Sequence, residues 1–400
     1  MRLLIIGHTS HYMRGDQIVG WGPTVREVNW LAKAFDSITH LACLHKGPAP
    51  ESALPYEADC VHLVPLPPAG GLTWRERFSA IKIAPLYFYT IIKYLPKADV
   101  VQVRTPGPLG LCAMLVLSIT KRKMRWTKFA GNWGATKANT LLVGFQRWWL
   151  RNGFTHGPVT VNGDWSFSHP HVYPFDNPSL SIDDLRQVYN FCAEKQLKEP
   201  IRLIFVGRLE SDKGVSKCLD IVQLLRHQTE VSLDILGGGS MIGNLRAKCA
   251  TLEIEKLVRF HGWVSIDQVK KYLLRAHFIL LPSSANEGWP KVLSEAMAYG
   301  VVPIASDISA IPQILSETQT GFALPSNDID QYVKAISDLV EEPSRWKAMV
   351  LAGLGSARKF SYEQYMIKLD EMFHSYYRNS PMNGTVLEEL RRKLEISYAG

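Results

Sequence analysis

Two glutamates separated by seven residues, Glu287 and Glu295, are side chains that could bind sugar hydroxyls. Carboxylates hold hydroxyl groups well because charge-assisted hydrogen bonds are stronger than neutral ones. The pair flanks Pro290, where we expect a helix to start after an apolar stretch that ends at Leu281. Gly300 is expected to end that helix. The alternative is that Glu287 caps the helix and Glu295 lies on its solvent-facing side.

Arg208 and Lys213 form a second pair, five residues apart in the segment from Gly207 to Gly214. A guanidinium offers a planar fork of donors and an ammonium a compact charge, and together they suit phosphate oxygens. Glycine at position 214 would let the following helix start close to a ligand. The segment comes directly after an apolar stretch, so we expect a phosphate-binding loop. A solvated basic loop is the alternative.

The expected helix after Pro290 adds a third anion-binding element, because the first N–H groups of a helix are unpaired and its dipole favours negative charge. We expect the amides of residues 291–293 to contribute. Two carboxylates beside a diphosphate are unfavourable unless they bind hydroxyls. The pattern therefore favours a nucleotide sugar, with Glu295 on the ribose and Glu287 on the transferred ring.

These loops need a rigid scaffold, and the sequence predicts one. Strand-length apolar segments alternate with helix-length amphipathic ones, which is typical of doubly wound parallel α/β sheets. The expected strands are residues 2–7, 38–44, 61–66, 98–103, 126–131 and 159–162, then 201–207, 232–237, 258–262, 278–281 and 301–305. A chain of 400 residues suits two domains. We place them at residues 1–180 and 181–360, joined through a proline-rich segment and followed by a helical segment and tail at 361–400.

Composition limits the function classes. With 46% hydrophobic and 20% charged residues, the chain is an ordinary folded protein and not a disordered or fibrous one. Its six cysteines contain no CxxC pair, which argues against a disulfide framework or zinc ribbon and for a reducing, cytoplasmic location. The apolar stretch at the start of the sequence is too short for a secretory signal. No apolar stretch elsewhere approaches the ~20 residues that a membrane span needs.

The net charge of +8 is concentrated in one segment. Between Trp74 and Lys128 the chain has eleven basic residues and two acidic ones, interspersed with aromatic residues. This mixture suits an anionic membrane surface. Core helices with solvated Lys and Arg faces are an equally good explanation, and nucleic-acid binding is disfavoured because no recognition motif accompanies the charge.

The motifs together resemble those of retaining GT-B glycosyltransferases of family 4. The resemblance covers the second half of the chain in family order and spacing. It rests on Gly207-Arg208 with Lys213-Gly214, on Glu287-Gly288-Trp289-Pro290 with Glu295-Ala296-Met297-Ala298, on Leu236 to Gly239, on Val258 to Val264, and on Val301 to Ser306. In the first half, Asp99 to Pro108 and the segment Gly20 to Pro23, expected as a loop before a helix, resemble weaker landmarks of the family.

The resemblance implies a GT-B fold, with two Rossmann-like domains facing across a cleft, the acceptor on the N-terminal domain and the donor on the C-terminal one. Arg208, Lys213 and Glu287 would be the catalytic residues. Arg208 and Lys213 would hold the diphosphate, and Glu287 would hold the donor sugar. Further donor contacts would come from Gly22, Gly207, Gly288, Trp289, Pro290, Lys291, Val292, Leu293, Glu295 and, near the base, Val264. The family's reaction implies no metal and no cofactor beyond the nucleotide-sugar substrate.

The N-terminal domain departs from the family in one respect. Members often carry a histidine after the strand expected at 126–131, where this chain has Asn132, which cannot act as a base. We expect Asn132 and His8 on the acceptor side, and His8 and His11 in the first loop as cleft residues and not metal ligands. The acidic pair Asp328 and Asp330 is expected at a helix start and not at a metal site.

The sequence thus predicts a retaining hexosyltransferase of polysaccharide or cell-envelope biosynthesis. It would use a nucleotide sugar and a glycan or lipid-linked acceptor, without nucleic acid, in the cytoplasm or on the inner face of the membrane. A catalytically silent nucleotide-sugar-binding or scaffold protein at the membrane is the alternative. Another GT-B enzyme, such as an epimerase or phosphorylase, is the second alternative, although no motif supports a pyridoxal lysine.

Overall fold

The computed structural model describes residues 1–71, 74–120, 123–135, 140–165, 169–285 and 287–395, with the backbone alone at 74–78. The chain forms two compact units. The first contains Met1–Asp176 and the described chain from Tyr362 onward, and the second contains Asn177–Ser361. The expected domain boundaries, at residues 180 and 360, lie close to the points where the chain passes from one unit to the other. The helical segment expected as a separate third part belongs instead to the first unit.

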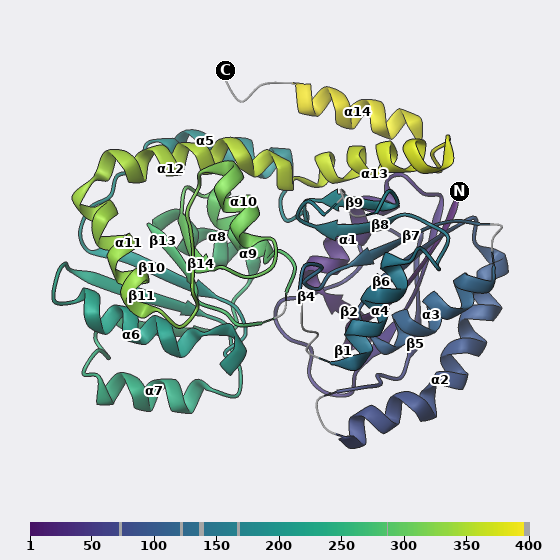
Figure 1. Ribbon diagram of the computed structural model, residues 1–400, viewed down its shortest axis with the longest axis horizontal. Helices are drawn as coiled ribbons and strands as arrows, with labels where there is room; N and C mark the ends of the chain where they lie inside the picture. Colours follow the sequence, from purple (N-terminus) through teal and green to yellow (C-terminus); the bar gives the residue numbers. More distant parts are fainter. Residues whose placement is uncertain (72–73, 121–122, 136–139, 166–168, 286, 396–400) are drawn as a thin grey trace. The chain divides into compact units, whose positions relative to one another are not determined.

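The first unit is built on a mainly parallel sheet with the strand order β5-β3-β1-β6-β7-β8-β9, to which β2 and β4 add antiparallel pairs (Figure 1). The strands are β1 Arg2–Arg14, β2 Gln17–Trp21, β3 Ser37–Leu44, β4 Ala53–Leu54, β5 Val61–Leu66, β6 Val100–Thr105, β7 Met124–Phe129, β8 Val159–Asn162 and β9 Val172–Phe175.

The first strand is longer than expected. The sequence predicts a strand over 2–7 and then a loop, but β1 runs on to Arg14 through an irregularity between Ile6 and Ser10. It continues because Gln17–Trp21 folds back on it as an antiparallel partner. His8 and His11 therefore lie on a strand and not in a loop, and that expectation was wrong.

Helices cover both faces of this sheet. They are α1 Gly22–Ala32, α2 Trp74–Tyr94, η1 Leu95–Lys97, α3 Pro108–Ile119, α4 Leu141–Arg151, α13 Tyr362–Tyr377 and α14 Gly384–Glu395. The crossovers through α2, α3 and α4 all advance the chain in one direction along the strand order, so the right-handed rule places these three helices on one face. Helices α1 and α13 share the other face, where the ring of Trp30 stacks on that of Tyr362 with centroids 5.4 Å apart.

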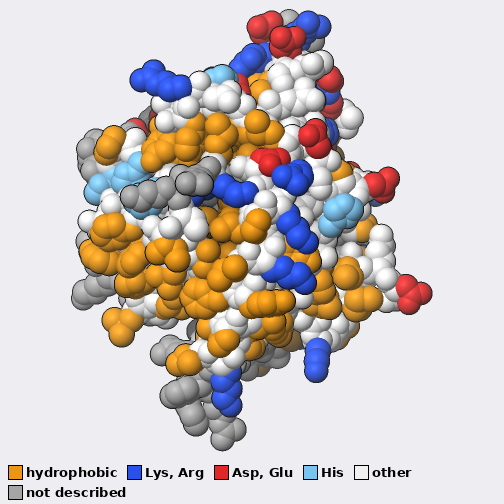
Figure 2. All heavy atoms as spheres, turned by 90° about the vertical axis from the view of Figure 1, so that its right-hand side faces the viewer, with side chains coloured by type: hydrophobic (Ala, Val, Ile, Leu, Met, Phe, Trp, Pro, Cys, Tyr) orange, Lys and Arg blue, Asp and Glu red, His pale blue; other side chains and the backbone are white. Residues whose placement is uncertain are grey.

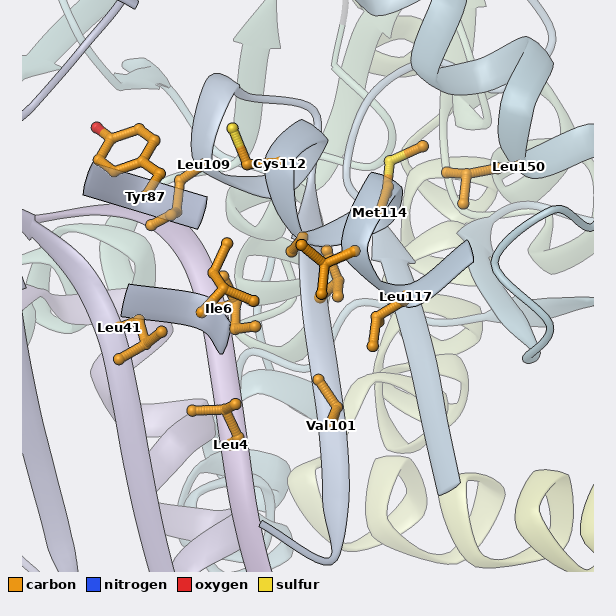
Figure 3. Close-up of a cluster of buried hydrophobic side chains, with 14 of the residues drawn as sticks. Leu4, Ile6, Leu41, Tyr87, Val101, Leu109, Cys112, Met114, Leu117 and Leu150 are labelled. Carbon is orange, nitrogen blue, oxygen red and sulfur yellow. The ribbon is translucent and has the colours of Figure 1, made fainter. Parts of the chain in front are cut away.

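The core beneath α2, α3 and α4 is a continuous apolar cluster (Figure 3). Alternate residues of β1 and β6, among them Leu4, Ile6 and Val101, point into it, as the two-residue period of a strand requires. Tyr87 of α2 and Leu117 of α3 close it from above and are fully buried. Burying each such aliphatic side chain contributes roughly 1.5–3 kcal/mol.

The C-terminal helix α13 is held to the first unit by a buried charge cluster. Glu27 is fully buried and accepts hydrogen bonds from Arg104 Nη1 at 2.9 Å, Lys128 Nζ at 2.7 Å and Tyr365 Oη at 3.1 Å. Desolvation lowers the pKa of Lys128 to about 8, and Glu27 opposes that change. A buried charge is tolerated only with such partners, so Tyr365 ties α13 to α1 and explains why the C-terminal segment is not independent.

The second unit is a fully parallel sheet with the order β12-β11-β10-β13-β14-β15. Its strands are β10 Ile201–Val206, β11 Val231–Leu236, β12 Val258–Gly262, β13 Phe278–Leu281, β14 Val302–Ser306 and β15 Phe322–Leu324. Five of these match the expected strands to within a residue, and β15 was not expected. The strand order reverses direction between β10 and β13, which is the topological switch point of the sheet.

Helices cover this second sheet on both faces, as doubly wound topology requires. They are α5 Ile182–Ala193, α6 Val215–Leu225, α7 Ile242–Thr251, α8 Ile266–Arg275, α9 Lys291–Ala298, α10 Ile311–Thr318, α11 Ile329–Glu341 and α12 Pro343–Ser356, with 3-10 turns at Ser211–Lys213 and Ala357–Phe360. Asp328 caps α11 through the N–H of Gln331, which confirms the helix start expected there. Within the described chain, every helix is too short or too polar to traverse a lipid bilayer.

The basic segment is divided between interior and surface. Arg104 and Lys128 belong to the buried cluster around Glu27, and Arg125 is 1% exposed and donates to the carbonyl of Leu117 at 2.7 Å. By contrast Lys82, Lys93 and Lys97 are exposed. The remaining basic residues include Lys123, which is half-buried, and four that lie outside the described side chains, namely Arg75, Arg77, Lys121 and Arg122.

A buried histidine joins the strands at the switch point. His277 precedes β13, accepts the Arg202 N–H through Nδ1 at 3.1 Å, and contacts Trp346 edge-on. Burial, with smaller contributions from Lys195 and Arg202, lowers its pKa to about 4. The folded state therefore resists protonation of a side chain that the unfolded chain protonates near pH 6.5.

Acid should destabilise the second unit through this residue. Because the unfolded chain binds the proton first, the free energy of unfolding should fall as pH drops from about 6.5 to about 4, by up to about 3 kcal/mol. His277→Asn keeps an acceptor for the Arg202 N–H and should flatten that slope in urea unfolding. The exposed His227→Asn is the matched control. An unchanged slope in His277→Asn would show that His277 does not control acid stability.

Candidate functional site at the switch point of the second sheet

The two chemistry-bearing motifs meet at the switch point. One motif follows β10 and the other follows β13, and these strands are hydrogen-bonded neighbours. Because parallel strands end at the same edge, the loops after them are brought together at the carboxyl end of the sheet, where such folds bind ligands. The sequence expectation that Gly207 to Gly214 and Glu287 to Glu295 serve one site agrees with this placement.

The loop after β10 is locked onto the loop after β13. Ser283 Oγ and the Ser284 N–H both donate to the carbonyl of Asp212, at 2.9 Å and 2.8 Å. Gly214 has φ +73°, and a Cβ there would lie 2.0 Å from the carbonyl oxygen of Pro282. Only glycine permits both this backbone conformation and this approach. The sequence indicated the glycine, but nothing in it pointed to the two serines.

Lys213 and Glu287 form an ion pair across the two loops. The Lys213 side chain is 10% exposed and that of Glu287 is 41% exposed. A cation so far removed from water needs a counter-charge, and Glu287 supplies it from the rim of the site. The sequence predicted a role for each residue but not their contact, because 74 residues separate them.

Arg208 lies differently from Lys213. It follows Gly207 at the end of β10 and is exposed, beside Glu210. Ser240 donates to Glu210 through its hydroxyl at 2.7 Å and its N–H at 3.2 Å, which lowers the pKa of Glu210. The convergence of Arg208 and Lys213 on one anion stays a prediction.

The helix after Pro290 starts where expected, since α9 spans Lys291–Ala298 with Pro290 as its N-cap, and Gly300 follows it with φ +62°. One expected donor is occupied, because the Leu293 N–H donates to the carbonyl of Pro290 at 3.0 Å. The expectation that all amides of 291–293 are free was therefore wrong at Leu293. Gly288 is buried before the helix, and its carbonyl accepts the Ala310 N–H at 3.4 Å.

Trp289 packs inside the second unit. Its ring stacks on Phe360 with centroids 5.3 Å apart, and its Nε1 lies 3.4 Å from Ser294 Oγ. Its carbonyl accepts from Asn177 Nδ2 at 3.4 Å. The side chain is 3% exposed, so the expectation of donor binding by Trp289 holds for its backbone at most. The ring instead fixes the position of the segment that carries Glu287.

Glu295 lies in α9 and is 9% exposed. Its carboxylate contributes to raising the pKa of Tyr299, after burial and the larger effects of Asp184 and Cys192. A carboxylate with so little exposure is not the solvent-facing helix residue that the alternative required. Asn286, the residue before Glu287 in the motif, lies outside the described residues.

The loops after β11 and β12 complete this edge. The Gly237 N–H donates to the carbonyl of Gly262 at 2.7 Å, and a Cβ on Gly238 would lie 2.6 Å from Trp263 Nε1. Trp263 is 37% exposed, and the half-buried Val264 follows it. The resemblance implied that Val264 lies near the base of the nucleotide. Trp263 was predicted only as a neighbour of Val264 near the base, and the exposure of its indole was not predicted, although the glycine run opposite is a signal for close packing.

The remaining predicted residues belong to the first unit. Gly22 is the first residue of α1 and follows β2 directly, so the expected Gly20 to Pro23 loop is wrong, and a Cβ on Gly22 would lie 2.5 Å from Ser52 O. His8 is half-buried with Nδ1 3.4 Å from Cys43 Sγ, and desolvation lowers its pKa. Asn132 keeps a buried Oδ1 without a hydrogen-bond partner among the described residues.

His11 has a structural place. It is fully buried, its Nδ1 lies 3.1 Å from the carbonyl of Thr9, and its Nε2 lies 2.8 Å from Tyr56 Oη. Desolvation lowers its pKa to about 4, so the ring is neutral at ordinary pH. The expectation that His11 lines a cleft as a loop residue was therefore wrong. His8 and Asn132 stay candidates on the acceptor side.

The architecture, two doubly wound domains with a polar site after β10 and β13, is that of the GT-B glycosyltransferases. Residues 191–353 match the family model of glycosyl transferases group 1. The chain is 28% identical over 176 residues to the amylovoran biosynthesis glycosyltransferase AmsK of Erwinia amylovora, covering 42% of each. It is 30% identical over 185 residues to the lipopolysaccharide 1,6-galactosyltransferase of Salmonella typhimurium, covering 44% of this chain and 51% of that protein.

A solved structure resembles the whole chain. HepE of Anabaena, in complex with UDP, matches with a TM-score of 0.65 at 14% identity, over 94% of this chain and 100% of HepE. This likeness establishes the GT-B fold. The matches to the two curated relatives span about half of their lengths or less.

The geometry of the phosphate loop makes a prediction about stability. Gly214→Ala forces a side chain into a positive φ and against Pro282 O, and should lower the free energy of unfolding by at least about 2 kcal/mol in urea. In Gly207→Ala, a variant in the same loop, the added Cβ would lie 3.6 Å from Phe205, which is ordinary van der Waals contact. The free energy of unfolding should therefore change by less than about 0.5 kcal/mol. Equal stability of the two variants would contradict the described close approach.

Proposed function

We propose that the protein is a retaining glycosyltransferase that moves a hexose from a nucleoside diphosphate sugar to a glycan or lipid-linked acceptor in polysaccharide or cell-envelope synthesis. The observation that carries the proposal is the pairing of Lys213 with Glu287 at the carboxyl edge of the second sheet. A buried cation and a rim carboxylate, side by side, suit a ligand that has both an anionic and a hydroxyl-rich part.

Lys213 and Arg208 are proposed to bind the diphosphate. In the free protein Glu287 neutralises Lys213, and a bound diphosphate would take over that role. Glu287 would then be free to accept hydrogen bonds from the donor sugar, and Glu295 from the ribose. Gly207, Gly288, Pro290, Lys291 and Val292 would supply the surrounding backbone and Val264 the contact near the base. We also predicted that the segment with Gly22 closes over the phosphates of the donor, and this stays a prediction.

The reaction would break the bond between the anomeric carbon and the diphosphate oxygen. Negative charge then develops on the leaving diphosphate, and preorganised cations stabilise it most effectively where water is excluded. Lys213, with little exposure, meets that condition. The acceptor hydroxyl oxygen would form the new bond to the anomeric carbon on the face that the diphosphate leaves, which gives retention, and its proton would pass to the departing diphosphate. No metal or further cofactor is part of this scheme.

The comparisons support an enzyme more than a silent scaffold. Two relatives are named for glycosyl transfer, one in amylovoran and one in lipopolysaccharide synthesis. The structurally similar HepE binds UDP. A nucleoside diphosphate sugar donor and an envelope glycan as acceptor follow as our inference for this chain, and a cytoplasmic location stays a prediction.

Removing the buried cation should weaken diphosphate binding. Lys213→Ala should lower the affinity for the best-binding of UDP, GDP and ADP by about 2 kcal/mol, the scale of a charge-assisted hydrogen bond. Lys248→Ala, which removes a lysine paired with Asp220 in the same unit, is the matched control. Calorimetry that finds the two variants equal to the unchanged protein would remove the phosphate assignment.

The stereochemistry tests the proposed reaction. The full chain is incubated with a panel of nucleoside diphosphate hexoses, and donor hydrolysis and transfer are followed by proton NMR of the anomeric signal. We expect the product to form first with the anomeric configuration of the donor. An inverted product would contradict the retaining mechanism, and no turnover of any donor by a protein that binds nucleoside diphosphates would favour the silent scaffold.

A further inference from the structure

The outer side of α2 is apolar although it faces solvent. Its inward residues, such as Tyr87 and Ile91, are fully buried against the sheet. The opposite side carries four large exposed apolar side chains, 44% to 68% exposed, which are Ile81, Leu86, Tyr89 and Ile92. A helix that only shields a core presents polar residues to water on that side. The apolar composition of the outward side of α2 therefore indicates a surface that binds a partner.

The same property extends to α4. Helices α2, α3 and α4 form one layer, since α2 packs on α3 and Trp149 of α4 donates to Ser118 of α3 at 2.9 Å. On the outer side of α4, Leu141 is 94%, Phe145 38% and Trp148 51% exposed. We call the exposed apolar side chains of α2 and α4, with the lysines beside those of α2, the α2–α4 surface.

The charge of this surface has one sign. Lys82, Lys93 and Lys97 are exposed beside the apolar residues of α2. From residue 77 to residue 163 the sequence contains a single acidic residue, Asp99, and Arg2 neutralises it at 2.9 Å. Figure 2 looks onto the side of the first unit that carries α2 and shows a broad apolar area crossed by lysines and arginines, with acidic side chains towards its margin.

We propose that the α2–α4 surface binds the anionic surface of a lipid bilayer, with α2 lying in the plane of the interface. Tyr89 and Trp148 have the amphipathic rings that favour the headgroup region. Lysine stems cover apolar surface while their charged ends reach lipid phosphates. This mode needs no spanning segment.

Charge complementarity selects a lipid surface over a second copy of the chain. A symmetric dimer through this surface would place the lysines of α2 against their own equivalents, and Asp99, the single acidic residue from 77 to 163, is already paired with Arg2. Anionic headgroups supply the missing charge without that repulsion. The proposal is independent of the transferase activity, because binding to vesicles needs neither donor nor acceptor.

The test is co-sedimentation of the full chain with phosphatidylcholine vesicles that contain or lack phosphatidylglycerol. We expect binding to the anionic vesicles at low salt, weaker binding as salt rises, and little binding to phosphatidylcholine alone. Lys93→Glu should weaken binding about tenfold, and Ile92→Glu at least as much, since both change the surface that inserts. Circular dichroism and thermal unfolding of both variants serve as the check that these exposed positions tolerate the changes.

Matched controls lie in the second unit. Phe191→Glu removes an apolar side chain that is 62% exposed on α5, and Lys256→Glu reverses an exposed lysine, and both should bind vesicles as the unchanged protein does. In a second measurement, brominated lipids should quench tryptophan fluorescence, and Trp148→Phe should remove most of the quenching.

Three results would overturn the proposal. They are no binding to anionic vesicles at low salt, equal loss of binding in the control variants, and a concentration-dependent dimer that Ile92→Glu dissociates while vesicle binding is absent. The last would identify the surface as an interface between copies of the chain. None of these outcomes bears on donor binding, so failure here leaves the proposed function standing.

Discussion

A lysine ammonium group that is almost excluded from water must have a negative partner, and the organisation of the second unit follows from how Lys213 meets that need. Its partner, Glu287, comes from the next loop across the switch point. The two loops can meet only because β10 and β13 are neighbours, and because Gly214 allows its backbone to touch Pro282. The stacking of Trp289 on Phe360 then holds the Glu287 segment in place.

This arrangement has a consequence for ligand binding. In the free protein the carboxylate stabilises a cation that would otherwise be costly to bury. In the proposed scheme, an entering diphosphate would replace Glu287 as the anionic partner of Lys213, which would avoid most of the cost of desolvating the lysine. The carboxylate that is displaced stays close to the group it can bind next. The proposed scheme would thereby couple diphosphate binding to the release of the Glu287 carboxylate, which could then accept hydrogen bonds from sugar hydroxyls.

Much of the second unit could be predicted from sequence because the signals are local. Glycine at 214 and 300, proline at 290 and the apolar strands each act within a few residues, and the structure has them as expected. The Lys213–Glu287 contact, the burial of Trp289 and the bonded amide of Leu293 depend on neighbours that the sequence does not reveal. The first unit shows the same limit. Extension of β1 depends on its pairing with β2, and the docking of α13 depends on Tyr365 reaching Glu27 across 338 residues.

The basic segment shows why charge counts alone mislead. Arg104, Arg125 and Lys128 turn inward and serve the core of the first unit, whereas Lys82 and Lys93 point outward beside apolar residues. From the sequence, a membrane-binding surface and core helices with solvated Lys and Arg faces explained the basic segment equally well, because the faces of the helices could not be assigned. Exposure of individual side chains separates the structural cations from those available to a partner.

The most direct measurement is calorimetric binding of a nucleoside diphosphate, without sugar, to Glu287→Gln. The substitution keeps the shape of the side chain but leaves Lys213 without its counter-ion, so the account predicts roughly tenfold tighter binding than in the unchanged protein, because a competing charge has been removed. Equal or weaker binding would contradict the view that Glu287 and the diphosphate alternate as partners of Lys213.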